Sequence, residues 1–360
     1  MRNPVTDVTG RQDILFERRG AAGIVTLNRP KALNAITHDM VRALAAKLDE
    51  WMTNPRVTRV VVTSSSERAF SAGGDVRAIY DLIKARQHRD ALSFFSDEYQ
   101  LNAAIKRYPK PYISLIDGIV MGGGAGISNH GSHRVAGDRY AFAMPEVSIG
   151  FFPDVGATYA LPRLAGEIGT YCALTGERLQ AADAVLAGAA THHVKSHRFA
   201  DLLAALCEQA PVNAILADFM DQVGAGEVMP RRRAIDRVFS HDRLEAILSA
   251  LDNEAGTGSE QADWSAETAR IIRSKSPTSL KLSLAQMRYG RHYSFEDCLR
   301  AEFRIVSRIV YGHDMTEGIR GVVVDKDNNP RWDPKSLDAI SDTMIDQYFA
   351  PLSGAELELP

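Results

Sequence analysis

Residues Val120–Leu164 read VMGGGAGISNHGSHRVAGDRYAFAMPEVSIGFFPDVGATYALPRL, and this stretch decides how the rest of the chain is organised. Three glycines, Gly122–Gly124, directly follow a largely apolar run and predict a strand that turns into a helix with exposed backbone N–H groups. Two isolated carboxylates follow in apolar surroundings, Glu146 and Asp154, where burial raises the pKa and the reactivity of a carboxyl group. Backbone donors beside buried carboxylates outline a site for acyl chemistry.

The composition is that of an ordinary soluble globular protein. The 360 residues are 45% hydrophobic and 24% charged, which suits one large domain or two smaller ones. The net charge of −3 argues against a nucleic-acid surface, and no apolar run reaches the roughly 18 residues of a membrane span. The three cysteines match no metal or redox spacing. Because the N-terminus has no apolar targeting core, we expect a cytoplasmic protein.

Strands and helices alternate before the central stretch. Residues 14–28 predict a β-hairpin, and Thr37 is placed to cap a helix that runs to about Thr53. This alternation predicts a layered α/β domain with a largely parallel sheet, followed from about Gly166 by a mainly helical region. The other elements expected before the central stretch are strands at Val60–Thr63 and Tyr112–Ile116 and helices at Val76–Arg86, capped by Asp75, and Ala91–Tyr108.

Two glycine-rich loops lie where strands end and helices begin. The run Gly122–Gly124 is no phosphate-binding P-loop, because no Gly-Lys-Ser/Thr follows, and it lacks the dinucleotide spacing. Taken alone it indicates only a tight turn. The second loop, Ala72–Asp75, stands at another such junction. Two junctions of this kind can aim two backbone N–H groups at one carbonyl oxygen, as the stabilisation of an oxyanion requires.

Each candidate carboxylate also has an ordinary structural interpretation. A lone glutamate such as Glu146 is more often a surface residue, although the apolar residues around it in 142–149 predict burial. Asp154 follows Pro153 and is a candidate helix N-cap, a role compatible with catalysis. From the sequence alone, Glu98 is predicted to lie on a solvated helix face. The chain has no G-x-S-x-G, no H-E-x-x-H and no full set of metal ligands.

The motifs LNRPKALNAI, AFSAGGDVRAIY and DGIVMGGGAGIS resemble the crotonase (enoyl-CoA hydratase/isomerase) superfamily. A longer set, including FAMPEVSIGFFPDVGATYALPRL and GHDMTEGIRGVVVDKDNNPRW, is similar to the 3-hydroxyisobutyryl-CoA hydrolase branch over roughly residues 14–340. The resemblance implies an α/β fold (α+β by some schemes), in which a crotonase-like ββα spiral core at 10–200 holds the CoA and oxyanion site on two roughly perpendicular sheets. A helical C-terminal region, 201–350, then covers the pocket.

The same resemblance implies roles for particular residues. The two oxyanion N–H groups match Ala72 and Gly123, of which Gly123 is also a substrate-binding position. Glu98 matches a residue that binds substrate at its 3-hydroxyl end, and Glu146 and Asp154 match the catalytic pair. The resemblance thus implies hydrolysis of 3-hydroxyisobutyryl-CoA, and also of 3-hydroxypropionyl-CoA, in valine breakdown, with Glu146 as nucleophile or as the base for a water molecule.

Two alternatives stay open at this point, an enoyl-CoA hydratase or isomerase and a catalytically silent CoA-binding protein. The first glutamate of the hydratases aligns with Gly126, which has no side chain and argues against hydration. The presence of both Glu146 and Asp154 argues against a silent site. We expect an acyl-CoA as the partner, no metal or separate cofactor, no nucleic acid or membrane, and, from the family, self-association.

Overall fold

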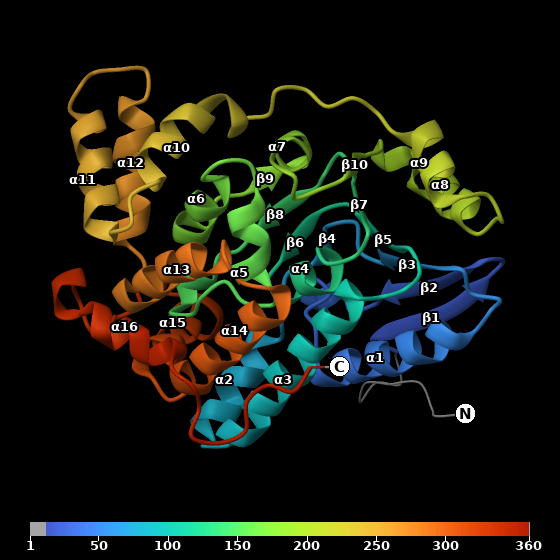
Figure 1. Cartoon of the computed structure of the whole chain (residues 1–360), viewed down its shortest axis with the longest axis horizontal. Coiled ribbons are helices and arrows are strands. Elements are labelled where there is room, and N and C mark those ends of the chain that lie inside the picture. The colour runs from blue at the N-terminus through green and yellow to red at the C-terminus, as the bar shows by residue number, and fades with distance from the viewer. Residues whose placement is uncertain (1–11, 360) are drawn as a thin grey trace.

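The computed structural model describes residues 12–359. Residues 1–11, which include the N-terminal stretch without a targeting core and the start of the predicted 10–200 core, lie outside this description, as does residue 360. Residues 14–193 build two sheets (Figure 1). Their strands are β1 (Ile14–Arg19), β2 (Ala22–Leu27), β3 (Arg59–Ser64), β4 (Ala69–Ser71), β5 (Tyr112–Ile116), β6 (Ile119–Met121), β7 (His133–Ala136), β8 (Ala141–Ala143), β9 (Leu179–Gln180) and β10 (His192–His193).

The larger sheet has the order β1-β2-β3-β5-β7-β10, and the smaller sheet has the order β4-β6-β8-β9. The predicted hairpin is confirmed, since β1 and β2 pair antiparallel with Ile14 opposite Leu27. The strands from β2 to β10 run parallel. In the smaller sheet β4, β6 and β8 run parallel and β9 runs antiparallel to β8. The predicted α/β class is therefore confirmed.

Successive side chains along the strands of the larger sheet point to opposite faces, and both faces are buried. Val60 and Val62 belong to one hydrophobic cluster, whereas Val61 between them belongs to another. Side chains alternate between the two faces of a strand, so each face of this sheet has its own cover. The cover of one face includes Leu44 of α1, and that of the other includes Leu202 of α8.

The described chain contains sixteen α-helices. Both predicted caps are confirmed, since Thr37 accepts a hydrogen bond from Met40 N–H at 3.2 Å and Asp75 accepts one from Ala78 N–H at 3.3 Å. The helices are α1 (His38–Thr53), α2 (Val76–Lys84), α3 (His88–Lys106), α4 (Gly123–Ser128), α5 (Ala157–Ala160), α6 (Ile168–Thr175), α7 (Ala181–Ala187), α8 (Phe199–Leu206), α9 (Val212–Phe219), α10 (Arg232–Phe239), α11 (Leu244–Ala255), α12 (Ala262–Arg273), α13 (Pro277–Gly290), α14 (Phe295–Ile309), α15 (His313–Ile319) and α16 (Asp342–Phe349).

The helices after residue 200 divide into two groups. Helices α8 and α9 pack on the larger sheet, well apart from α10–α16 (Figure 1). Helix α14 lies against α3, and α15 lies against α2. The group that contains α14 and α15 is the one next to the central stretch, while the division of the chain at residue 200 stays a prediction.

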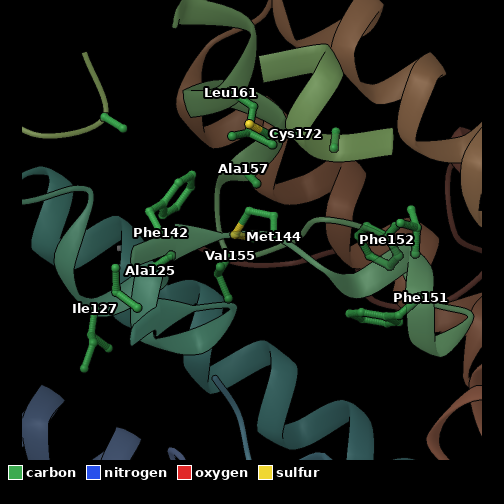
Figure 2. Packing of buried hydrophobic residues seen from close by; sticks show 14 of the residues in the cluster. Ala125, Ile127, Phe142, Met144, Phe151, Phe152, Val155, Ala157, Leu161 and Cys172 are labelled. Atoms are coloured by element: carbon green, nitrogen blue, oxygen red, sulfur yellow. The ribbon is translucent and has the colours of Figure 1, made fainter. Parts of the chain in front are cut away.

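Apolar side chains from the central stretch pack against one another around its two carboxylates. Figure 2 shows Phe142 and Met144 beside Val155, with Phe151 and Phe152 a short distance along the chain. All five are no more than 4% exposed. The sequence around Glu146 and Asp154 therefore forms part of the core, which makes both carboxylates buried groups.

Candidate active site

A cavity of about 260 Å³ lies where the smaller sheet meets α2, α3 and α15. The short turn η2 (Glu146–Ile149) and the π-helical segment η6 (Arg320–Val324) close two of its sides. Most of the lining is apolar and includes Phe94, Phe95 and Phe151. The structure also brings together in this lining the five residues that the sequence singles out: Ala72, Glu98, Gly123, Glu146 and Asp154.

The two glycine-rich loops face each other, but the predicted donor on the first loop is wrong. The N–H of Ala72 donates to the carbonyl of Leu33 at 2.9 Å, so it has no free hydrogen for a ligand. Within residues 12–359 the N–H groups of Gly74 and Gly123 have no partner. Gly123 opens α4, where a first-turn N–H has no acceptor inside the helix. The two N–H groups available to an oxyanion are therefore those of Gly74 and Gly123.

The distance between the loops explains why glycine stands at position 123. A Cβ placed there would lie 3.1 Å from the nitrogen of Gly74 and 2.5 Å from Oε1 of Glu98. The same close approach occurs at Gly122, where φ is +44° and a Cβ would lie 3.1 Å from Oε1 of Glu146. Two free N–H groups and two carboxylates thus converge within a few ångströms.

Glu146 is a buried carboxylate at the start of η2, not a surface residue. It is 7% exposed and its Oε2 has no hydrogen-bond partner among the described residues. Burial, followed by the negative charge of Asp154, raises the pKa of Glu146 well above its usual range. Helix α15 fixes this turn by backbone contact, since a Cβ on Gly318 would lie 2.2 Å from the carbonyl carbon of Ile149.

Asp154 and Glu98 also line the cavity. Asp154 does not cap α5, whose N-cap is Gly156; its Oδ2 instead accepts a hydrogen bond from the hydroxyl of Tyr99 at 2.9 Å. Burial raises the pKa of Asp154 to about 7. Glu98 is 2% exposed, so it is not part of a solvated helix face, and burial, then Asp154 and Glu302, raises its pKa strongly.

No room exists for the additional glutamate of a hydratase at Gly126. A Cβ there would lie 2.8 Å from Cβ of Val155 and 2.9 Å from Nδ2 of Asn102. Both neighbours are fully or almost fully buried. The sequence shows that position 126 lacks a carboxylate, and the structure adds that packing has closed the space such a side chain needs.

Sequence reasoning missed three residues of this site. Gly74 carries no sequence signal that separates it from Ala72, because the distinction depends on Leu33 in another segment. Tyr99 directly follows Glu98 in the sequence, and no motif marks it as a site residue. Glu302 leaves a signal in the sequence, since it lies in the predicted helical region at a position flanked by apolar residues, and it is 0% exposed in α14.

The described residues give no metal site. No group of three His, Cys, Asp or Glu side chains in residues 12–359 is arranged to hold a metal ion. In the same part of the chain no helix is both long enough and apolar enough to cross a membrane.

Comparison with known proteins places this geometry among CoA-thioester enzymes. The model of the enoyl-CoA hydratase/isomerase family matches residues 22–349. The chain is 41% identical to the mitochondrial 3-hydroxyisobutyryl-CoA hydrolase of Gallus gallus and 38% identical to that of Homo sapiens; each match covers 96% of this chain and 91% of the relative. The solved structure of a carnitinyl-CoA dehydratase from Mycobacterium thermoresistibile is 40% identical, with a TM-score of 0.90 over 97% of this chain and 99% of that one.

Proposed function

This chain belongs to the enoyl-CoA hydratase/isomerase family, and we propose that within it the protein is an acyl-CoA thioester hydrolase that converts 3-hydroxyisobutyryl-CoA to the free hydroxy acid and CoA. Full-length relatives at 38–41% identity bear the name of this hydrolase. The observation that carries the proposal is the convergence of two free N–H groups, at Gly74 and Gly123, with the buried carboxylate of Glu146 in one cavity.

The two N–H groups take the thioester oxygen. As the carbonyl carbon becomes tetrahedral, its oxygen gains negative charge, and fixed donors at about 2.7–3.1 Å stabilise that charge. The donors of Gly74 and Gly123 come from two different loops and are fixed by β4 and α4, so no reorganisation is needed when the charge develops. This pair supplies the electrostatic part of catalysis.

Glu146 supplies the attack on the thioester carbon. Its raised pKa makes it a stronger base and a stronger nucleophile than an exposed glutamate. Either Glu146 attacks directly, expels the CoA thiolate and forms a mixed anhydride that water then hydrolyses, or it takes a proton from a water molecule that attacks. Both routes consume one water and release one acid and one thiol. A single turnover in ¹⁸O-labelled water that leaves label on Glu146 establishes the anhydride route.

Glu98 and Asp154 bind the 3-hydroxyl group. Glu98 Oε1 is buried without a partner, and an unpaired buried polar atom carries a free-energy cost that a substrate hydroxyl removes. The methyl branch of the substrate then contacts the apolar lining formed by Phe95, Phe151 and Val323. A site built this way discriminates against an acyl group without the hydroxyl.

Thiol release across a small acyl-CoA panel tests the proposal. We expect turnover with 3-hydroxyisobutyryl-CoA and 3-hydroxypropionyl-CoA, and a kcat/KM at least about 100-fold lower with isobutyryl-CoA, which has the same branch but no hydroxyl. The alternative, an enoyl-CoA hydratase, is favoured by the likeness to a solved structure named as a dehydratase but disfavoured by the filled space at Gly126. Faster hydration of crotonyl-CoA than thiol release would replace the hydrolase by that alternative.

Three further expectations belong to the same proposal. We propose that the reaction uses no metal or separate cofactor, which dialysis against a chelator tests through unchanged thiol release. Self-association is a second expectation, open to light scattering. The third is a cytoplasmic location; the relatives from Gallus gallus and Homo sapiens are named mitochondrial, so fractionation of the source cells decides this point.

A further inference from the structure

Asp154 begins a backbone turn whose conformation an L-residue rarely adopts. Val155 has φ of +53° and Gly156 follows with φ of +84°. Positive φ is unfavourable for a β-branched residue and persists only where the surrounding structure fixes it. The turn places Asp154 in the cavity lining, so whatever holds the turn also sets the position of this carboxylate.

Two side chains from distant parts of the sequence hold the turn from behind. Glu302 of α14 accepts the N–H of Gly156 at 2.7 Å with one carboxylate oxygen and the N–H of Thr158 at 2.9 Å with the other. Nε2 of His130 donates to the carbonyl of Val155 at 2.6 Å, which requires the hydrogen on that nitrogen. Three backbone polar groups of the strained turn are thus paired by two buried side chains.

The carboxylate of Glu302 is an unusual choice for a purely structural anchor. It is 0% exposed, and the partners of its two carboxylate oxygens are the backbone N–H groups of Gly156 and Thr158, not the side chain of a Lys or Arg. Its charged neighbours are acidic, since both Asp154 and Glu98 interact with it unfavourably. A buried charge without a cation is costly, and a neutral side chain would anchor the backbone without repelling the cavity carboxylates.

We propose that Glu302 is a positioning residue for the hydrolysis, which fixes the turn that aims Asp154 into the cavity and, through its charge, limits how many of the neighbouring carboxyl groups ionise together. The proposal rests on the function assigned to Asp154 above. Limiting ionisation matters because a cavity with several negative charges repels the oxyanion that forms between Gly74 and Gly123. A proton retained in the cluster reduces that repulsion.

The titratable surroundings of Asp154 are few and well defined. They comprise Glu98 and Tyr99 from α3, Glu146 from η2 and Glu302 from α14, together with His130, which follows α4 and is bonded to the carbonyl of Val155. Burial raises the pKa of Asp154 to about 7, and burial followed by the charge of Asp154 raises that of Glu302 to about 8. Besides burial, the charge of Asp154 also raises the pKa of Glu98 and of Glu146, so the carboxyl groups of this cluster lose their protons in shared steps.

The experiment follows the ionisation of Asp154 directly. The protein is labelled with ¹³C at the aspartate carboxyl carbon, and the Asp154 signal is identified by its loss in Asp154→Asn. In the wild type we expect this signal to titrate in more than one step, because the ionisation of its carboxyl neighbours changes the pKa of Asp154. In Glu302→Gln the titration of Asp154 moves to lower pH, because one neighbouring negative charge is gone while Glu98 and Glu146 remain. Tyr99→Phe removes a hydrogen bond that favours ionised Asp154, so in that variant the titration moves to higher pH.

Kinetics and a matched control complete the test. Glu302→Gln retains one acceptor for the turn but replaces the other with a donor, and we expect kcat to fall by up to about 100-fold while KM changes little. Glu296→Gln makes the same chemical change on the same helix at a surface ion pair with Arg107 and leaves both titration and kcat as in the wild type.

Each outcome decides a separate point. An Asp154 titration that is the same in wild type and Glu302→Gln overturns the proposal, as does wild-type kcat in a folded Glu302→Gln protein. If Glu302→Gln does not fold, the coupling is measured from the other side: with ¹³C at the glutamate side-chain carboxyl carbon, the Glu302 signal should titrate at lower pH in Asp154→Asn than in the wild type, and an unchanged Glu302 titration overturns the proposal. The NMR titration does not depend on turnover. A wild type that releases no thiol therefore rejects the proposed function, while the titration still tests the coupling between Glu302 and Asp154.

Discussion

Gly123→Ala is the sharpest test of the oxyanion pair, because the change keeps the backbone N–H and adds a single methyl group. That methyl would lie 3.1 Å from the nitrogen of Gly74 and 2.5 Å from Oε1 of Glu98. An oxyanion must itself lie about 2.7–3.1 Å from both donors. The methyl therefore occupies the space between the loops that the substrate oxygen needs.

The expected loss follows from the number of donors that become unusable. Excluding one oxyanion donor typically costs about 2.7–4 kcal/mol in the transition state, which corresponds to about 10²–10³ in kcat. Because the methyl separates the oxygen from Gly74 and displaces Glu98, we expect at least this loss. Thiol release with 3-hydroxyisobutyryl-CoA measures it. Gly123→Pro removes the N–H itself and should abolish turnover.

The matched control is Gly224→Ala, at a position where an added Cβ meets no atom within 4 Å. It should release thiol like the wild type. Circular dichroism and thermal unfolding establish that Gly123→Ala is folded. A folded Gly123→Ala protein with kcat within threefold of wild type would refute the assignment of the pair Gly74 and Gly123.

Three other predictions follow from the same cavity. Glu146→Gln keeps the shape of the side chain but removes its charge, so we expect kcat to fall by orders of magnitude with a smaller change in KM; retention of most thiol release would reject Glu146 as nucleophile or base. Gly126→Glu should not create a hydratase and should destabilise the protein by about 1–3 kcal/mol or more through overpacking, measured by urea unfolding and crotonyl-CoA hydration. The third concerns pH: Asp154 and Glu302 have folded pKa values of about 7 and about 8, above the roughly 4 of an unfolded carboxyl. The folded state therefore holds more protons between about pH 4 and 8, so the free energy of unfolding should fall as pH rises through this window, and Asp154→Asn should flatten that slope; an unchanged slope contradicts the assigned shifts.

Local features of the fold can be predicted from the sequence because they depend on residues that are close together in the chain. The caps at Thr37 and Asp75, the hairpin at 14–28 and the burial of Glu146 all follow from residues within a few positions. The smaller sheet is harder to predict from the sequence, since a strand such as β4 (Ala69–Ser71) has only three residues, too few for a hydrophobic period. Its existence was expected only from the family resemblance.

The sequence by itself indicated acyl chemistry at two carboxylates and a glycine-rich turn, and its resemblance to a known family implied an acyl-CoA substrate, because composition, spacing and motif are properties of the chain. Only the tertiary structure decided which N–H groups are free, since Leu33 takes the hydrogen of Ala72 and leaves Gly74 unpaired. The same is true of Glu302, which reaches the turn after Asp154 across 146 residues of sequence. Hydrogen-bond pairing and the ionisation of buried carboxyl groups depend on atoms that meet only in the folded chain, and no local pattern records them.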